Sequence, residues 1–162
     1  MKPVLVAIAV GMLGYGPFLH AQNCASAISL ASNSTYVSDT TGTTNWMFSF
    51  GPLLSTANDQ LYTFVAGPSP RSNLTPTASS YAFAMYLITS CSDAGSEPAP
   101  IRATATVGMP IALEGTPPPG QPPIVEGERY YLAVTGTAAT GANGTLTFDT
   151  GFPVTLQTFT VD

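Results

Sequence analysis

The fold of this chain is decided by one stretch, Gly127-Glu128-Arg129-Tyr130-Tyr131-Leu132-Ala133-Val134-Thr135-Gly136. Glycines bound the stretch, and aromatic and β-branched residues typical of β-strands lie between them. Successive side chains of a strand point to opposite faces, which separates two sets: Tyr130, Leu132 and Val134, and Tyr131, Ala133 and Thr135. A second alternating run at 145–148 follows through Asn143-Gly144. This spacing predicts that the two strands form an antiparallel pair.

Further alternating runs, separated by turn residues, lie before this stretch, and one more lies near the end of the chain. They predict strands at 25–32, 35–38, 45–50, 59–65, 72–77, 80–89 and 101–107, with a last strand at 154–161. Pro76 is expected to end its strand early. The run 80–89 is apolar on both faces, which is typical of a central strand, with a helix as the alternative. The chain is therefore predicted to be an all-β, antiparallel β-sandwich of about nine strands.

The first 21 residues look like a cleaved signal peptide. Lys2 gives a positive start, residues 4–13 form an uncharged apolar run, and Ala21 is a small residue of the kind found at cleavage sites. The apolar run is shorter than the roughly 20 residues of a membrane span, so a membrane anchor is the less favoured alternative. We expect the protein to be exported, to the cell exterior or the periplasm, with residues 22–162 as a single domain.

The predicted mature domain is acidic and poor in catalytic side chains. The only lysine, Lys2, and the only histidine, His20, lie in the leader, which leaves Arg71, Arg102 and Arg129 against nine acidic residues. This balance disfavours nucleic acid and anionic membranes as partners. Without histidine or lysine, Ser-His, Cys-His and Schiff-base chemistry are excluded. We therefore expect a protein that is not an enzyme, with glycoside hydrolysis by paired carboxylates as the remaining alternative.

Two cysteines, Cys24 and Cys91, are expected to form one disulfide, because exported proteins mature in oxidising compartments. Two free thiols are the alternative. No cofactor is predicted, but calcium is the ion that the composition favours, since it needs only oxygen ligands. Asp93 with Glu97 is the candidate site, and two other local pairs are alternatives, Asp39 with Asn45 and Glu126 with Glu128. Solvated surface acids are the competing interpretation.

Aromatic side chains form the other candidate site, because a flat strip of rings is one way in which β-sandwich modules hold sugars. The candidate residues are Tyr131, Trp46 and Tyr86. Tyr131 shares its face with Ala133 and Thr135, which favours exposure. Trp46 shares its strand face with Phe48 and Phe50, which favours burial in the core.

Several segments, in order, resemble the bacterial pre-peptidase C-terminal domain and its stand-alone relatives. The matching segments are Cys24-Ala25, residues 58–64 with Asp59 before Tyr62-Thr63-Phe64, the run 85–88 leading to Cys91, the stretch 127–136, and Gly144-Thr145-Leu146-Thr147. The resemblance implies a jelly-roll-like β-sandwich. Members of this family normally sit behind a protease catalytic domain.

These observations predict a secreted, non-enzymatic β-sandwich module that binds an extracellular polysaccharide or protein, or assists export. The alternative is a structural subunit or adhesin of an extracellular assembly. Such a homo-oligomer would be joined through sheet edges and the proline-rich segment at 115–123.

Overall fold

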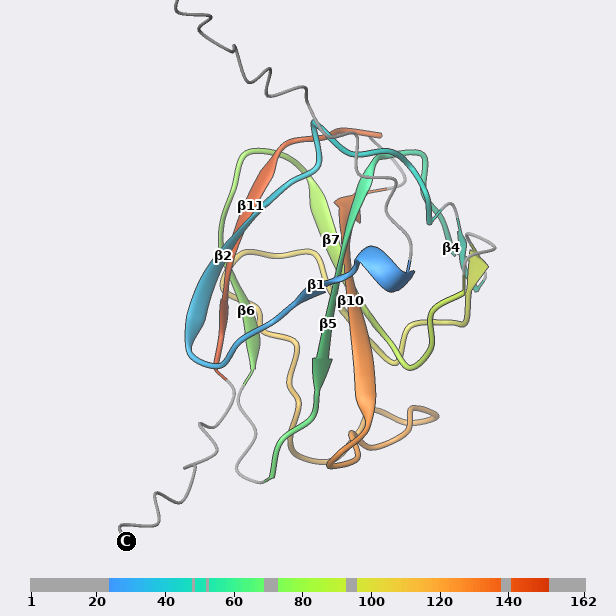
Figure 1. Ribbon diagram of the computed structural model, residues 1–162, viewed down its shortest axis with the longest axis vertical. Coiled ribbons are helices and arrows are strands. Elements are labelled where there is room, and N and C mark those ends of the chain that lie inside the picture. The colour runs from blue at the N-terminus through green and yellow to red at the C-terminus, as the bar shows by residue number, and fades with distance from the viewer. Residues whose placement is uncertain are drawn as a thin grey trace, which may run out of the picture.

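The computed structural model describes residues 24–47, 49–51, 53–68, 73–92, 96–137 and 141–151. Over these residues the protein is an all-β sandwich (Figure 1). The larger sheet has five strands, in the order β1 (Ile28–Ser29), β5 (Asp59–Val65), β10 (Arg129–Gly136), β7 (Phe83–Ile88) and β9 (Arg102–Thr104). The facing sheet has three, in the order β2 (Ser34–Asp39), β11 (Thr145–Thr150) and β6 (Leu74–Ser79). A short third sheet joins β4 (Leu53–Leu54), β3 (Ser49–Phe50) and β8 (Ser96–Glu97), and a 3-10 turn, η1 (Cys24–Ser26), precedes β1.

The stretch at 127–136 contains β10, the central strand of the five-stranded sheet. It pairs antiparallel with β5 on one side and β7 on the other, so that Leu132 lies opposite both Tyr62 and Leu87. The predicted alternation is confirmed, because Tyr130, Leu132 and Val134 all belong to the main core. A strand with apolar residues on both faces and partners on both edges is suited to this central place.

The main core fills the space between the two facing sheets. Phe148 on β11 joins the layers, because its ring stacks on Tyr36 of β2 with centroids 5.6 Å apart and meets Tyr62 of β5 edge-on at 5.2 Å. Phe148, Leu132 and Leu146 have no exposed surface. Burial of such apolar area is the main term that stabilises a sandwich of this kind.

The predicted hairpin between residues 130–135 and 145–148 is wrong. β11 pairs with β2 and β6 in the facing sheet, whereas β10 pairs with β5 and β7. The chain leaves β10 at Gly136, where a Cβ would collide with the carbonyl oxygen of Ala142. The connection thus crosses from one layer to the other, which lets both strands turn their apolar faces into the same core.

Most of the other predicted strands are present with shifted ends. Segment 80–89 contains β7, which decides for the strand and against the helix. Pro76 does not end its strand but lies within β6, at the edge of its sheet, where a missing N–H is tolerated. The predicted strand at 154–161 and the leader at 1–21 lie outside the described residues. The jelly-roll connectivity stays a prediction.

The predicted disulfide is confirmed. Cys24 in η1 and Cys91 after β7 are joined with an S–S distance of 2.03 Å and a Cα–Cα distance of 5.7 Å. The bond therefore fastens the start of the described chain to the end of a strand next to β10. Within the described ranges, no helix has the length and apolar character that a membrane crossing requires.

Candidate functional site: an aromatic face on the five-stranded sheet

The outer face of the five-stranded sheet carries a second, smaller hydrophobic cluster. Its fully buried members are Met47, Leu61, Ile88 and Ala133. Partly buried side chains pack against them, namely Trp46, Tyr86 and Tyr131 together with Ala27 and Cys91. We call Trp46, Tyr86 and Tyr131 the outer aromatic face. The fold brings these three residues, the aromatic candidates from the sequence, onto one cluster.

The strand register makes Tyr86 and Tyr131 diagonal neighbours. Ala133 on β10 lies opposite Tyr86 on β7, and Tyr131, two residues earlier on the same face of β10, lies opposite Ile88. Diagonal positions on a sheet are within reach of aromatic side chains. Both tyrosines are half-buried, so part of each remains open to solvent. Burial raises the pKa of Tyr86.

Trp46 reaches this face on an extended segment that Asp59 holds in place. Oδ2 of Asp59 accepts hydrogen bonds from the backbone N–H groups of Trp46 (3.0 Å) and Met47 (2.8 Å). The sequence predicts strand pairing at these residues, but the N–H groups of Trp46 and Met47 bond Asp59 instead. The predicted strand at 45–50 is therefore wrong over residues 45–47, and β3 begins at Ser49. Met47 is fully buried, whereas Trp46 is half-buried. Phe48 lies outside the described residues.

Because the Asp59 carboxyl is buried, we expect the free energy of unfolding to fall as the pH rises from about 4 to about 6. This carboxyl is fully buried, and burial raises its pKa from 3.8 to about 6, although the hydrogen bonds from Met47 and Trp46 act in the lowering direction. Folding therefore favours the protonated form. This contribution is complete below a pH of about 3.8 and is lost as the pH rises through the folded-state pKa of about 6. The loss amounts to about 3 kcal/mol.

Urea unfolding of the wild type and of Asp59→Asn, at a series of pH values across this window, measures the effect. Asparagine keeps an acceptor for the two N–H groups but cannot ionise, so the stability difference between the proteins should change with pH by the stated amount. Asp39 does not interfere, because hydrogen bonds from the Thr41 side chain and backbone lower its pKa below 3.8. Parallel pH profiles for the two proteins would show that Asp59 does not titrate in this range.

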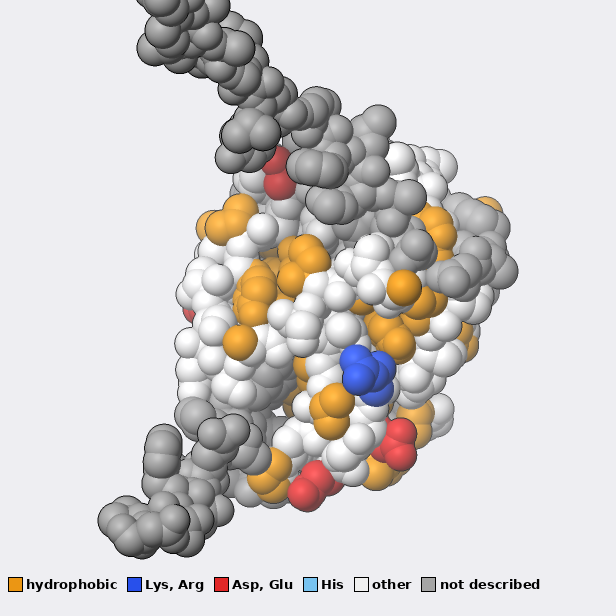
Figure 2. All heavy atoms as spheres, in the orientation of Figure 1, with side chains coloured by type: hydrophobic (Ala, Val, Ile, Leu, Met, Phe, Trp, Pro, Cys, Tyr) orange, Lys and Arg blue, Asp and Glu red, His pale blue; other side chains and the backbone are white. Residues whose placement is uncertain are grey.

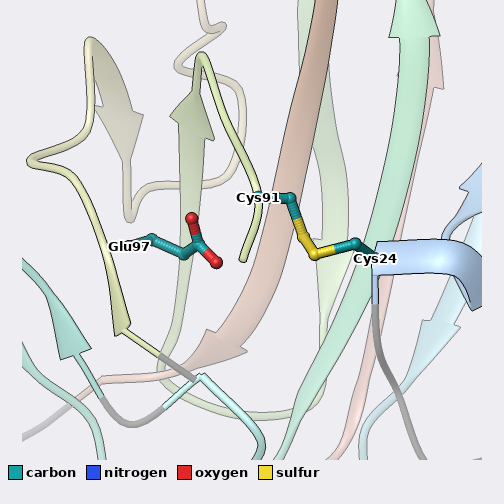
Figure 3. Close-up of side chains that lie close together, drawn as sticks. All are labelled: Cys24, Cys91 and Glu97. Atoms are coloured by element: carbon teal, nitrogen blue, oxygen red, sulfur yellow. A yellow bond between two sulfur atoms is a disulfide. The ribbon is translucent and has the colours of Figure 1, made fainter. Parts of the chain in front are cut away.

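The candidate calcium pair is described only in part. Asp93 lies outside the described residues, and Glu97 is buried, with its Oε1 accepting the Ser92 N–H at 2.6 Å. Glu97 lies close to the disulfide (Figure 3). In the described part of the chain, Cys24, Cys91 and Glu97 are the only three ligand-type groups that come together, and both sulfurs are already bonded to each other. A calcium site at Asp93 and Glu97 stays a prediction.

Sequence reasoning did not assign a role to Asp59, although a signal for it was present. Asp59 shares one face of its strand with Leu61 and Thr63, and all three are buried. An acid at the buried end of an apolar strand face needs partners that compensate for its desolvation. Here those partners are backbone N–H groups of the segment that carries Trp46.

Comparisons of the chain with protein-family models, with curated proteins and with solved structures found no match. The resemblance to the pre-peptidase C-terminal domain therefore stays a prediction.

Proposed function

We propose that the protein is an exported, non-enzymatic module that binds an extracellular polysaccharide on the outer aromatic face. The observation that carries this proposal is the gathering of Trp46, Tyr86 and Tyr131 on one cluster, each of them half-buried. A core aromatic such as Phe148 is fully buried instead. Half-buried rings offer a flat apolar surface on which the C–H faces of sugar rings can pack.

The support beneath this face favours binding, because it fixes the rings before a ligand arrives. Met47, Leu61, Ile88 and Ala133 lie underneath with no exposed surface. Asp59 holds the backbone at Trp46, and the disulfide joins the cluster through Cys91. Rings that are already ordered lose little conformational entropy on binding, which strengthens the complex.

Export and a non-catalytic role rest on separate observations. The Cys24–Cys91 disulfide is of the kind that persists in oxidising compartments, and the leader-like residues 1–21 agree with it. The non-catalytic role is supported by the lack of histidine and lysine beyond the leader. The buried carboxylate next to the aromatic face, Asp59, bonds backbone N–H groups of Trp46 and Met47.

Tyr131→Ala is expected to weaken polysaccharide binding by about tenfold or more, because it removes a preorganised ring from the contact surface. A glycan array with the mature protein identifies the ligand, and titration calorimetry with that glycan measures the loss. Tyr86→Ala should act in the same direction.

Tyr81→Ala is the matched control. Tyr81 is also a half-buried tyrosine, but it packs against the main core and not against the outer cluster. Its removal should leave glycan affinity unchanged in the folded protein. If Tyr131→Ala and Tyr81→Ala bind as tightly as the wild type, the outer aromatic face is not the binding surface.

A structural subunit is the second candidate, and one observation favours it. The edge strand β4 of the short sheet has two exposed leucines, Leu53 at 44% and Leu54 at 67%. An apolar sheet edge can pair with another chain. Light scattering that rises with protein concentration, in a protein that binds no glycan on the array, would favour assembly over glycan binding.

A further inference from the structure

A pocket of about 200 Å³ lies at the start of β10. Its walls include Pro122, Pro123 and Tyr130, and its polar lining includes Glu128 and Arg129. Pockets that hold drug-sized ligands measure roughly 300–1,000 Å³. This smaller pocket therefore suits one ring of a ligand and not a whole oligosaccharide.

Arg129 connects the pocket to the face of β10 that carries Tyr131. Arg129 lies two residues before Tyr131 and so shares its face of β10. Nη1 of Arg129 donates to Oγ1 of Thr63 at 3.4 Å, and Thr63 lies opposite Tyr131 across the strand pair. Thr89, which also lines the pocket, lies one residue beyond Ile88, the partner of Tyr131 across the strand pair. A glycan that covers Tyr131 can thus reach Arg129 at the pocket.

Hydrogen bonds fix the segments that form the walls of the pocket. Arg102 donates from Nη1 to Oε1 of Gln121 at 2.8 Å and from Nη2 to the carbonyl oxygen of Pro122 at 3.2 Å, which fixes the proline segment. The hydroxyl of Tyr130 accepts the N–H of Val125 at 2.8 Å. The two arginines therefore differ in role, because Arg102 supports the loop whereas Arg129 is exposed at the pocket.

Arg129 and Glu128 supply the polar chemistry. Both side chains are exposed, and the described part of the chain places no carboxylate within ion-pair distance of Arg129. The backbone of Glu128 is fixed, since its carbonyl oxygen accepts the N–H of Ala66 at 2.9 Å. A guanidinium donates and a carboxylate accepts, so together they match the hydroxyl groups of a sugar, which do both.

The negative net charge of the protein favours neutral sugars over acidic ones as ligands. The chain has a formal net charge of −5, and the pocket lining includes one cationic residue, Arg129, and one acidic residue, Glu128. Figure 2 likewise shows sparse charges among mostly uncharged and hydrophobic side chains on the face in view. A polyanionic glycan would be repelled by this surface, whereas a neutral one would not. We infer that the pocket is a second subsite of the proposed glycan-binding surface, which takes one neutral pyranose unit between the prolines and the side chains of Arg129 and Glu128. This inference rests on the proposed function.

The test uses two substitutions that change the net charge in opposite directions. Arg129→Gln and Glu128→Gln are each expected to weaken binding of a neutral glycan by about tenfold, because each removes a charged hydrogen-bonding group. The probes are cello-, malto-, manno- and xylo-oligosaccharides, with oligogalacturonate as the acidic counterpart. Affinity is measured by titration calorimetry with the tightest neutral binder.

Glu126→Gln is the matched control. Glu126 is exposed and is not part of the pocket lining, and its substitution changes the charge as Glu128→Gln does. It should leave the affinity unchanged. Thermal unfolding of all three variants checks that the fold is intact, as expected for exposed side chains.

The outcomes separate the subsite from the proposed function. If Arg129→Gln weakens binding while Glu128→Gln strengthens it, and oligogalacturonate binds best, the ligand is acidic and the inference is overturned. If neither substitution matters while Tyr131→Ala still abolishes binding, the polysaccharide-binding face stands and the subsite falls. A wild-type protein that binds none of the probes overturns the subsite together with the proposed function.

Discussion

Replacing both cysteines by alanine is expected to lower the free energy of unfolding by about 4 kcal/mol. The disulfide joins Cys24 and Cys91, which are 67 residues apart, so it closes a long loop in the unfolded chain. Closing such a loop restricts the unfolded ensemble and raises its free energy relative to the folded state. The effect is large compared with the total stability of a domain of this size, which is about 5–15 kcal/mol.

Urea unfolding of the wild type, with and without a thiol reductant, and of the double variant measures this effect. The reduced wild type and the Cys24→Ala/Cys91→Ala variant should have similar midpoints, both well below that of the oxidised protein. Either single substitution should cost about as much as the double one, because each breaks the same bond. Equal midpoints for the oxidised wild type and the double variant would mean that the cross-link contributes no stability.

Phe148→Ala is expected to cost about 4 kcal/mol, near the upper part of the range for large-to-small changes in a core. Phe148 has no exposed surface and lies between the two sheets. It contacts Tyr36 of its own sheet and Tyr62 of the facing one. Alanine would leave a cavity between the layers and would remove both ring contacts at once.

Val37→Ala is the matched control for this substitution. Val37 lies on β2, next to β11 in the same sheet, and is 65% exposed. Its loss should change the free energy of unfolding by no more than about 0.5 kcal/mol. Thermal or urea unfolding of both variants makes the comparison. A small effect for Phe148→Ala would show that the two sheets do not share the core described here.

The sequence predicted the faces of individual strands better than their partners. The alternation alone separates the two side-chain sets of β10 correctly, and the structure places Tyr130 and Leu132 of the first set in the main core. The predicted pairing of β10 with β11 is wrong, because a hairpin and a connection between two sheets show the same local sequence pattern. Gly136 illustrates the difficulty, since the close approach of Ala142 to it is a contact that no local rule predicts.

For the aromatic candidates, too, the sequence identified the residues but not their neighbours in space. Trp46, Tyr86 and Tyr131 were selected from the sequence, but their gathering on one cluster was not predicted. Trp46 was expected on a buried strand face, and it is instead half-buried on a segment held by Asp59. A buried carboxylate with two backbone donors overrode the strand propensity of residues 45–47. Such an effect depends on a contact between residues that lie 13 positions apart.

By itself, the sequence determined the all-β class, the division of the β10 side chains between two faces, the disulfide and the acidic character of the chain. The tertiary structure alone decided that β10 and β11 lie in different sheets and that three distant aromatics share one outer face. The physical reason is that alternation follows from the geometry of one extended backbone and is therefore local. The choice of neighbours depends on which apolar faces can be buried together, and that is settled only when the whole chain packs.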